Sequence, residues 1–330
     1  MTNIYPLIKN ETIKILKKRS FLVIMIILAV IIPIATYAQM RIAENMVKQT
    51  GTSDWHVKVQ SDITDARARL SSSRMPEEYK KYVQVQIEVK QYHLDMDIDP
   101  DAPTGVNFAR RFMENASSLL LPLLVIIVAS DLVSSENALG TIKLLLARPV
   151  MRWRILLSKY VSLIFLVSLV ILAAGILAYL ISGFVFGFSG WTLPVLTGFQ
   201  LSGTNVSTEN VHTVSYAYYL WMEYGLAWFS SLTIATMSFL ISTLVRSTAF
   251  SMGIMLASTI FGTILANMVS SWESAKYLFM VNSDLTAYLA GKPSPIDGMD
   301  LSFSIWTLTI WAGAALLVAF TVFTRKDMLN

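Results

Sequence analysis

The sequence of 330 residues contains no cysteine and only three histidines. Without cysteine, the chain has neither a disulfide framework nor a thiolate nucleophile. His56, His93 and His212 lie far apart in the sequence and lack a metal-binding spacing such as H-E-x-x-H. No G-x-S-x-G motif for a nucleophilic serine occurs either. We therefore expect a chain that is not an enzyme.

Two segments begin like ligand sites but do not complete the pattern. Gly198–Asn205 starts like a phosphate-binding loop, but Thr204 stands where that loop requires lysine. The alternating acids from Asp95 onward suggest calcium ligands. A calcium loop counted from Asp95 or Asp97, however, lacks the glycine and glutamate that it needs. We interpret the acidic segment as a solvated turn, and we predict no metal and no cofactor bound by this chain.

Charged residues are also scarce, at 15% of the chain, whereas 54% of the residues are hydrophobic. An average soluble domain has roughly 25% charged residues, so this composition indicates an integral membrane protein. Crossing a bilayer takes about 20 apolar residues in a helix. We predict an all-α integral membrane protein with six transmembrane helices, at residues 21–39, 112–132, 156–186, 218–244, 250–269 and 303–323.

Lysine and arginine are unevenly distributed among the segments between these spans. They gather before the first span and after the second, fourth and sixth spans. The positive-inside rule therefore makes both termini cytoplasmic, together with residues 1–20, 133–155, 245–249 and 324–330. Residues 40–111, 187–217 and 270–302 then face outward. A formal charge of only +4 gives no reason to expect a nucleic-acid partner.

The residues before and within the first span allow alternatives. Ile4, Leu7, Ile8 and Ile15 fall mostly on one helical face, which is typical of an amphipathic helix at the membrane surface. The same lysine-rich segment would also serve as a basic flank that only sets orientation. The apolar run before Gln39 resembles a secretory signal, but it exceeds the usual ~7–15 residues. We predict a retained span.

The outward segment 40–111 predicts a helical hairpin. Its helices are expected at Trp55–Leu70 and Glu77–Tyr92, because Pro76 and Glu77 suit the first turn of a second helix. Serine-rich residues before Pro76 would form the break between them. The sequence therefore predicts an extracellular pair of helices.

Two acidic residues near the ends of the spans, Glu114 and Glu223, form a candidate substrate path together with Tyr219. A charge in hydrocarbon costs at least about 2.5–3.5 kcal/mol, so each carboxylate should face protein, water or a headgroup. The alternative is that the aromatic residues around Glu223 form a belt at the membrane surface.

The cytoplasmic segment after the second span has a pattern of its own. A helix is predicted over Ser135–Ala147, with Glu136 in its first turn and Gly140 allowing close approach of another surface. Pro149 should end it. One face carries Leu139, Ile142 and Leu146. Such a helix would contact either a soluble partner or anionic membrane lipid.

This segment resembles a known family. The run S-S-E-N-A-L-G-T-I-K-L-L-L-A-R-P-V-M-R-W-R-I-L-L-S-K at Ser134–Lys159 is similar to the segment after the second span of ABC-2-type transporter permeases. The amino-terminal Asn10–Arg19 resembles the same family. So does the layout of six spans with a large first outer loop, as in bacterial permeases of the sodium-efflux and peptide-antibiotic-resistance branch, with a type V exporter-like fold.

The resemblance implies a permease subunit of an ATP-driven exporter in the bacterial cell membrane. Its partners would be a cytoplasmic ABC ATPase subunit, which would hold ATP and Mg, and a second copy or a homologous permease. Residues 270–302 would form short re-entrant helices. The resemblance does not identify the exported substrate, which could be an antimicrobial peptide, a drug, a lipid or an ion. The residues implied to couple to the ATPase are Glu136, Leu139, Gly140, Thr141, Ile142, Leu145, Leu146, Pro149 and Arg152.

An alternative is a membrane sensor or immunity protein that binds an extracellular peptide and transports nothing. The chain shows no cytoplasmic signalling domain, which argues against this alternative. A gene for an ATPase beside the gene for this chain would favour the exporter.

Overall fold

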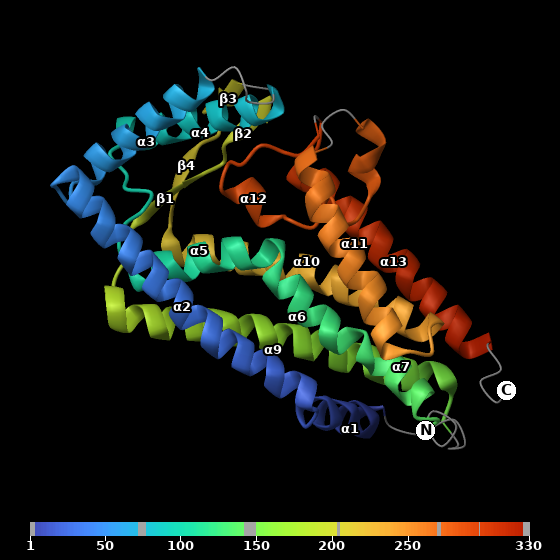
Figure 1. Cartoon of the computed structure of the whole chain (residues 1–330). Helices are drawn as coiled ribbons and strands as arrows, with labels where there is room; N and C mark the ends of the chain where they lie inside the picture. The colour runs from blue at the N-terminus through green and yellow to red at the C-terminus, as the bar shows by residue number, and fades with distance from the viewer. Residues whose placement is uncertain are drawn as a thin grey trace.

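The computed structural model describes residues 4–71, 77–141, 150–202, 205–268, 272–296 and 298–325. Helices dominate it, and six of them are long and apolar enough to cross a membrane, which confirms a helical multi-pass membrane protein (Figure 1). These candidate spans are Arg19–Lys48, Leu120–Ala138, Arg152–Phe186, Tyr216–Leu244, Thr248–Ala266 and Leu301–Arg325.

Helices α1 (Tyr5–Leu16) and α2 (Arg19–Thr50) begin the chain. Helix α2 passes through Pro33 and ends at Gly51, whose φ of +69° suits a glycine after a helix. The helix is continuous through Gln39, so the first span extends beyond the predicted boundary at residue 39. The residues after Gln39 mix polar and apolar side chains, and many of them are good helix formers, which explains why the helix outlasts the apolar run.

The second span begins later than predicted. Helix α5 (Gly105–Ser118) is separated from α6 (Leu120–Ala129) by Leu119, whose φ of −141° is not helical. Helix α7 (Asp131–Ala138) continues the span after Ser130. Helix α5 carries polar and charged residues and packs along the second half of α9 (Arg152–Phe186). In the structure the candidate span covers Leu120–Ala138, and Phe112 and Met113, at which the predicted apolar run begins, belong to α5.

The contact between α5 and α9 depends on a close approach of two backbones. The amide of Gly105 donates to the carbonyl of Gly187 over 3.0 Å. A methyl group on Gly105 would lie 2.9 Å from the Cα of Gly183 and 2.8 Å from the Gly187 oxygen. Both atoms belong to the backbone, so neither moves aside at low cost.

We therefore expect Gly105→Ala to lower the free energy of unfolding by about 1–3 kcal/mol, the usual effect of overpacking. The midpoint of thermal unfolding in detergent measures it. Gly253→Ala is the matched control, because a methyl group there meets no atom within 4 Å. In a helix, that alanine should leave stability unchanged or raise it by up to ~1 kcal/mol. Equal midpoints for both variants would contradict the packing argument.

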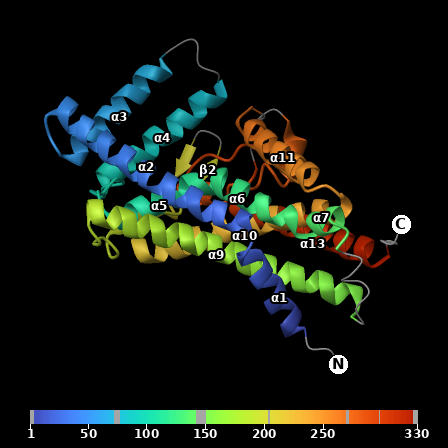
Figure 2. The same ribbon diagram turned by 60° about the horizontal axis from the view of Figure 1, so that its bottom comes forward.

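At one end of the bundle, α3 (Trp55–Leu70) and α4 (Glu77–Asp95) pack against each other. Their shared core consists of Val59, Ile63, Val83 and Ile87. Figure 2 shows this pair on one side of the bundle, while α1 projects at another.

Short strands lie beneath the α3–α4 pair, within residues 187–217, which were predicted only as an outward loop of an all-α protein. Strand β1 (Pro194–Thr197) pairs antiparallel with β4 (His212–Ser215), and β2 (Gln200–Ser202) pairs with β3 (Asn205–Ser207). Successive side chains of a strand point to opposite faces. Val195 accordingly packs with Tyr216, and Leu196 packs with Ile98.

Helices α10 (Tyr216–Leu244), α11 (Thr248–Met268) and α13 (Leu301–Arg325) complete the bundle. The segment between α11 and α13 contains the short helices η1 (Glu273–Tyr277) and α12 (Thr286–Leu289). Phe279 and Leu285 of this segment are buried in the core that α10 forms. The hydroxyls of Ser117 and Thr286 lie 2.8 Å apart and tie the segment to α5.

Hydroxyl groups hold α10 against α6 and α7. The hydroxyls of Ser130 and Ser238 lie 2.7 Å apart. The hydroxyl of Ser242 donates to the Ser130 carbonyl over 2.8 Å and accepts from the amides of Val133 and Ser134. This interface is polar inside a largely apolar bundle, and all three serine side chains are buried.

Candidate functional site

Glu136 occupies the last turn of α7 rather than the first turn of a new helix. Helix α7 ends at Ala138, and Gly140 has a φ of +69°. The predicted continuous helix Ser135–Ala147 is therefore interrupted at Gly140, which corrects the expected role of Glu136 at a helix start. The reason is local, because glycine after a helix adopts the left-handed conformation that ends it.

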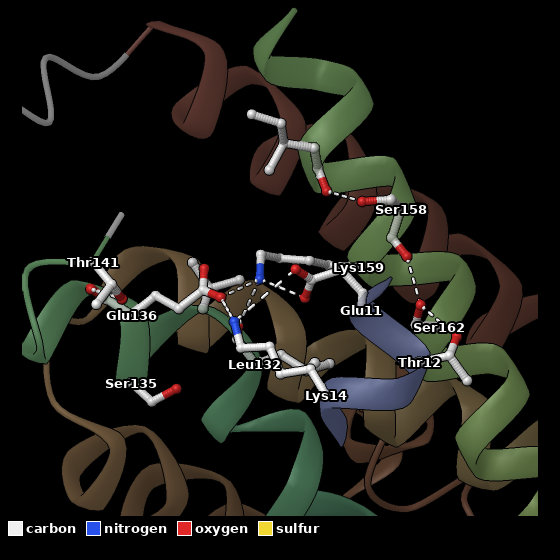
Figure 3. Close-up of polar contacts among 12 residues, drawn as sticks. Glu11, Thr12, Lys14, Leu132, Ser135, Glu136, Thr141, Ser158, Lys159 and Ser162 are labelled. Carbon is white, nitrogen blue, oxygen red and sulfur yellow. Dashed lines mark hydrogen bonds and ion pairs between the residues drawn. The ribbon is translucent and has the colours of Figure 1, made fainter. Parts of the chain in front are cut away.

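Glu136 belongs to a cluster of four charged side chains that join α1, α7 and α9. Figure 3 shows Lys159 of α9 between Glu11 of α1 and Glu136 of α7. Its Nζ lies 2.8 Å from a carboxylate oxygen of each. Lys14 of α1 donates a further hydrogen bond to Glu136. We call these four residues the charge cluster.

The charge cluster is buried and electrically balanced. Lys159 is 1% exposed and Glu136 is 3% exposed. The Lys159 ammonium has three donors, and it contacts both carboxylates and the Leu132 carbonyl, which is 3.4 Å away. A buried charge is tolerated when it is paired and hydrogen-bonded. The two carboxylates and two ammonium groups meet this condition together.

Lys14 stands at the partly exposed edge of the cluster. Burial alone would lower the pKa of Lys14, but its hydrogen bond to Glu136 and the charges of Glu11, Glu136 and Asp131 outweigh burial and raise the pKa above its ordinary value. The Lys14 ammonium therefore keeps its proton at neutral pH.

Further contacts fix α7 to its neighbours. Lys18 pairs with Asp131 at 2.6 Å and donates to the hydroxyl of Ser135. The Ser134 hydroxyl donates to Thr248 of α11 over 3.1 Å. Helix α7 thus contacts α1, α9, α10 and α11, so a displacement of α7 is transmitted to each of them.

The turn after α7 points outward. Leu139 is 77% exposed although it is apolar. A methyl group on Gly140 would meet no atom of the described residues within 4 Å, so close packing does not explain the glycine. Its positive φ does, because other residues rarely adopt this conformation. The Thr141 hydroxyl donates to the Glu136 carbonyl at 3.5 Å. We call Leu139–Thr141 the exposed turn.

The other residues of the predicted coupling set divide in two. Arg152 is the first residue of α9, and its Nη1 donates to the Thr324 carbonyl at 3.5 Å. The rest lie outside the described residues: Ile142, Leu145, Leu146 and Pro149.

The three residues of the predicted substrate path lie near one another at the opposite end of the bundle. Tyr219 and Glu223 are buried on one face of α10. Glu114 of α5 pairs with Arg110 and with Lys292. The aromatic residues around Glu223 differ in exposure. Tyr219 is buried beside it, whereas Tyr218 and Trp221 are exposed, as the predicted belt at the membrane surface requires.

The sequence alone does not show the charged partners of Glu136 and Glu114. For Glu136, it places Glu11 and Lys159 in motif-like segments and Lys14 in a basic flank. For Glu114, it gives no signal for Arg110 or Lys292. One signal was available, because Lys159 lies between Leu156 and Val161 at the start of an apolar run, where an unpaired charge would be costly. Among the described residues, no group of three or more histidine, aspartate or glutamate side chains is arranged to hold a metal ion.

Comparisons with known proteins support a membrane family. The chain is 29% identical over 282 residues to "Uncharacterized protein YhcI" of Bacillus subtilis (strain 168), covering 85% of this chain and 87% of that protein. It is 27% identical over 217 residues to "Uncharacterized membrane protein YdbK" of the same organism, covering 64% of this chain and 79% of that protein. The model of a family described as "Protein of unknown function (DUF2705)" matches residues 87–329. Because that match spans most of the chain and all but the first of the candidate spans, this multi-pass membrane protein belongs to the DUF2705 family.

Proposed function

We propose that this chain is the membrane subunit of an ATP-driven exporter and that a separate cytoplasmic ATPase docks on the exposed turn. The observation that carries this proposal is the link between the exposed turn and the charge cluster. The turn begins where α7 ends, and Glu136 in the last turn of α7 is bound to both α1 and α9. A force on the turn would therefore move three helices together.

The proposal includes an orientation and a set of partners. Both termini and the exposed turn face the cytoplasm, and α3, α4 and the short strands face outward. Two such chains, or this chain and a homologous one, bind two ATPase subunits, which hold ATP and Mg. This chain contributes no catalytic group. Lysines on α1 support the orientation, because basic residues concentrate on the cytoplasmic side.

The resemblance of Ser134–Lys159 to ABC-2 permeases supports the same function. The exposed turn contains Gly140 and Thr141, which match that family pattern, and Leu139 is the apolar side chain beside them. An exposed leucine on a mostly polar turn offers apolar surface to a soluble partner, and burying it fully would contribute roughly 1.5–3 kcal/mol.

We expect Leu139→Asp to abolish binding of the ATPase encoded beside this chain, or to weaken it by roughly tenfold or more. A charge would then replace the apolar side chain that the interface with the ATPase buries. Co-purification from a strain that expresses both proteins and ATPase activity in lipid nanodiscs measure the effect. Val57→Asp on α3 is the matched control, because Val57 is also apolar and exposed but lies at the other end of the bundle. Binding and activity that survive Leu139→Asp would overturn the docking assignment.

The same experiment addresses the competing function. A sensor or immunity protein that binds a peptide and transports nothing needs no ATPase. If no ATPase co-purifies with the wild-type chain, the exporter is the wrong proposal and the sensor takes its place.

A further inference from the structure

A cavity of about 350 Å³ lies between the α3–α4 pair and the bundle. Helix α4 lines it with Lys90 and His93, α5 with Arg110 and Glu114, and α10 with Tyr219, among others. This volume falls within the range of sites for small organic molecules, which is roughly 300–1,000 Å³. The cavity is lined by an unusual number of charged side chains for such a site.

One carboxylate of the cavity wall has two cationic partners. Glu114 lies 3.1 Å from Nη1 of Arg110 and 2.7 Å from Nζ of Lys292. Burial would raise the pKa of Glu114, but the charges of Lys292 and Arg110 outweigh it and lower the pKa below its ordinary value. Glu114 is therefore ionised at neutral pH.

A second carboxyl group behind the wall has no partner. Glu223 lies one turn after Tyr219 on the same face of α10 and is 0% exposed. Within the described part of the chain, neither of its carboxylate oxygens accepts or donates a hydrogen bond. An ionised carboxylate in such a place is very costly, so Glu223 carries its proton here.

Arg110 lies within electrostatic reach of both carboxyl groups but binds only one. Its guanidinium bonds to Glu114 and to the side chain of Asn107, and it stands 5.6 Å from the centre of the Tyr219 ring. The groups that act electrostatically on Glu223 are Arg110 and Glu114 of α5 and Lys292 after α12. The phenols of Tyr219 and Tyr224 on α10 also lie close to Glu223. The site thus already holds a guanidinium over an aromatic ring beside two acids.

We propose that this cavity binds an organic cation, an alkylammonium or alkylguanidinium group, and that binding releases the proton of Glu223. The entering cation pairs with Glu114 and the Tyr219 ring. Arg110 is then free to turn from Glu114 towards Glu223, and the proton of Glu223 is released to the solvent. Before binding, the charges of the three groups that act on Glu223, namely Arg110, Lys292 and Glu114, sum to +1. Afterwards the ligand adds one positive charge and Glu223 one negative charge, so the sum is unchanged.

That the cation is cargo rests on the proposed exporter function, whereas binding and proton release do not. Both are measured on the purified full chain in lipid nanodiscs without any ATPase. The probe is octylguanidine, with octanol as the uncharged control of equal chain length and octyl sulfate as the anion. Calorimetry in two buffers of different ionisation enthalpy counts the protons released.

We expect saturable binding of octylguanidine with release of about one proton, and weaker binding of both controls. Glu223→Gln should weaken binding by roughly tenfold or more, because the charge sum then rises on binding, and it should release no proton. Its thermal stability should equal that of the wild type, since a neutral amide replaces a neutral carboxyl group of the same size. Glu209→Gln, on an exposed turn, is the matched control and should bind like the wild type.

Several results would overturn the proposal. They are no saturable binding by the wild type, stronger binding of octyl sulfate, or binding without proton release. Proton counting needs no variant, so it decides the matter even if Glu223→Gln does not fold. If octylguanidine binds as expected but does not change the activity of a bound ATPase, the cation site stands and its role in export fails.

Discussion

Lys159→Met is expected to lower the free energy of unfolding by about 3–5 kcal/mol, the usual cost of removing one partner from a buried ion pair. Lys159 is the only residue that touches both Glu11 and Glu136 at 2.8 Å within the described residues. Methionine fills a similar volume, so the loss would come from charge and not from a cavity. Titration with SDS in mixed micelles measures the free energy of unfolding.

A second substitution separates charge from packing. In Lys159→Met, Glu11 and Glu136 share the single cation Lys14, which leaves one negative charge in excess. Adding Glu11→Gln removes that excess and keeps the pair between Lys14 and Glu136. We expect the double variant to regain at least half of the lost stability.

Lys17→Met provides the control for replacing a lysine at the same end of the bundle. Lys17 is exposed, so its change should stay within about 0.5 kcal/mol. If Lys159→Met were as stable as Lys17→Met, the charge cluster would not hold α1, α7 and α9 together.

Gly140→Val is expected to reduce stimulation of the partner ATPase by tenfold or more while the chain stays folded. Valine in the left-handed conformation would be strained by about 1–3 kcal/mol. A β-branched side chain disfavours the φ of +69° that Gly140 adopts, so the exposed turn would leave α7 in another direction. The measurement is ATPase activity of the complex in nanodiscs, together with the unfolding midpoint of the chain.

Gly140→Asn is the matched variant for this experiment. Asparagine tolerates the left-handed conformation better than other residues, and the space around Gly140 accepts a side chain. It should therefore retain most of the coupling. Equal loss with valine and asparagine would mean that the partner needs a bare backbone at Gly140, and equal retention would mean that the direction of the turn is unimportant.

The apolar runs predicted the spans best where they are long and end in clear signals. Helix α10 begins two residues from its predicted start and ends at Leu244 as predicted, because polar residues flank both sides of a long run. The second span starts later than predicted, and the sequence did contain a local signal for the break at Leu119. Ser117 and Ser118 precede it, and Pro122 lies in the first turn of α6, where proline suits a helix start.

The acidic residues of the site could be predicted from the sequence, but their charged partners could not. Glu136 and Glu223 stand out because charge is rare in this chain. Their surroundings depend on residues distant in sequence, since 148 positions separate Lys159 from Glu11. A single sequence gives spacing along a helix, and it says nothing about which helix lies opposite. The different outcomes for the two acids, one paired with two lysines through a single carboxylate oxygen and one with no hydrogen-bond partner among the described residues, therefore required the structure.

The serine contacts between α10 and α7 affect how these helices move. Ser130, Ser238 and Ser242 hold the interface through hydroxyls that rotate and serve as donor or acceptor. Because a hydroxyl rotates without moving the backbone, these hydrogen bonds can adjust to small displacements, whereas interlocked leucines would have to separate. The serine interface therefore keeps α10 joined to α7 when α7 is displaced.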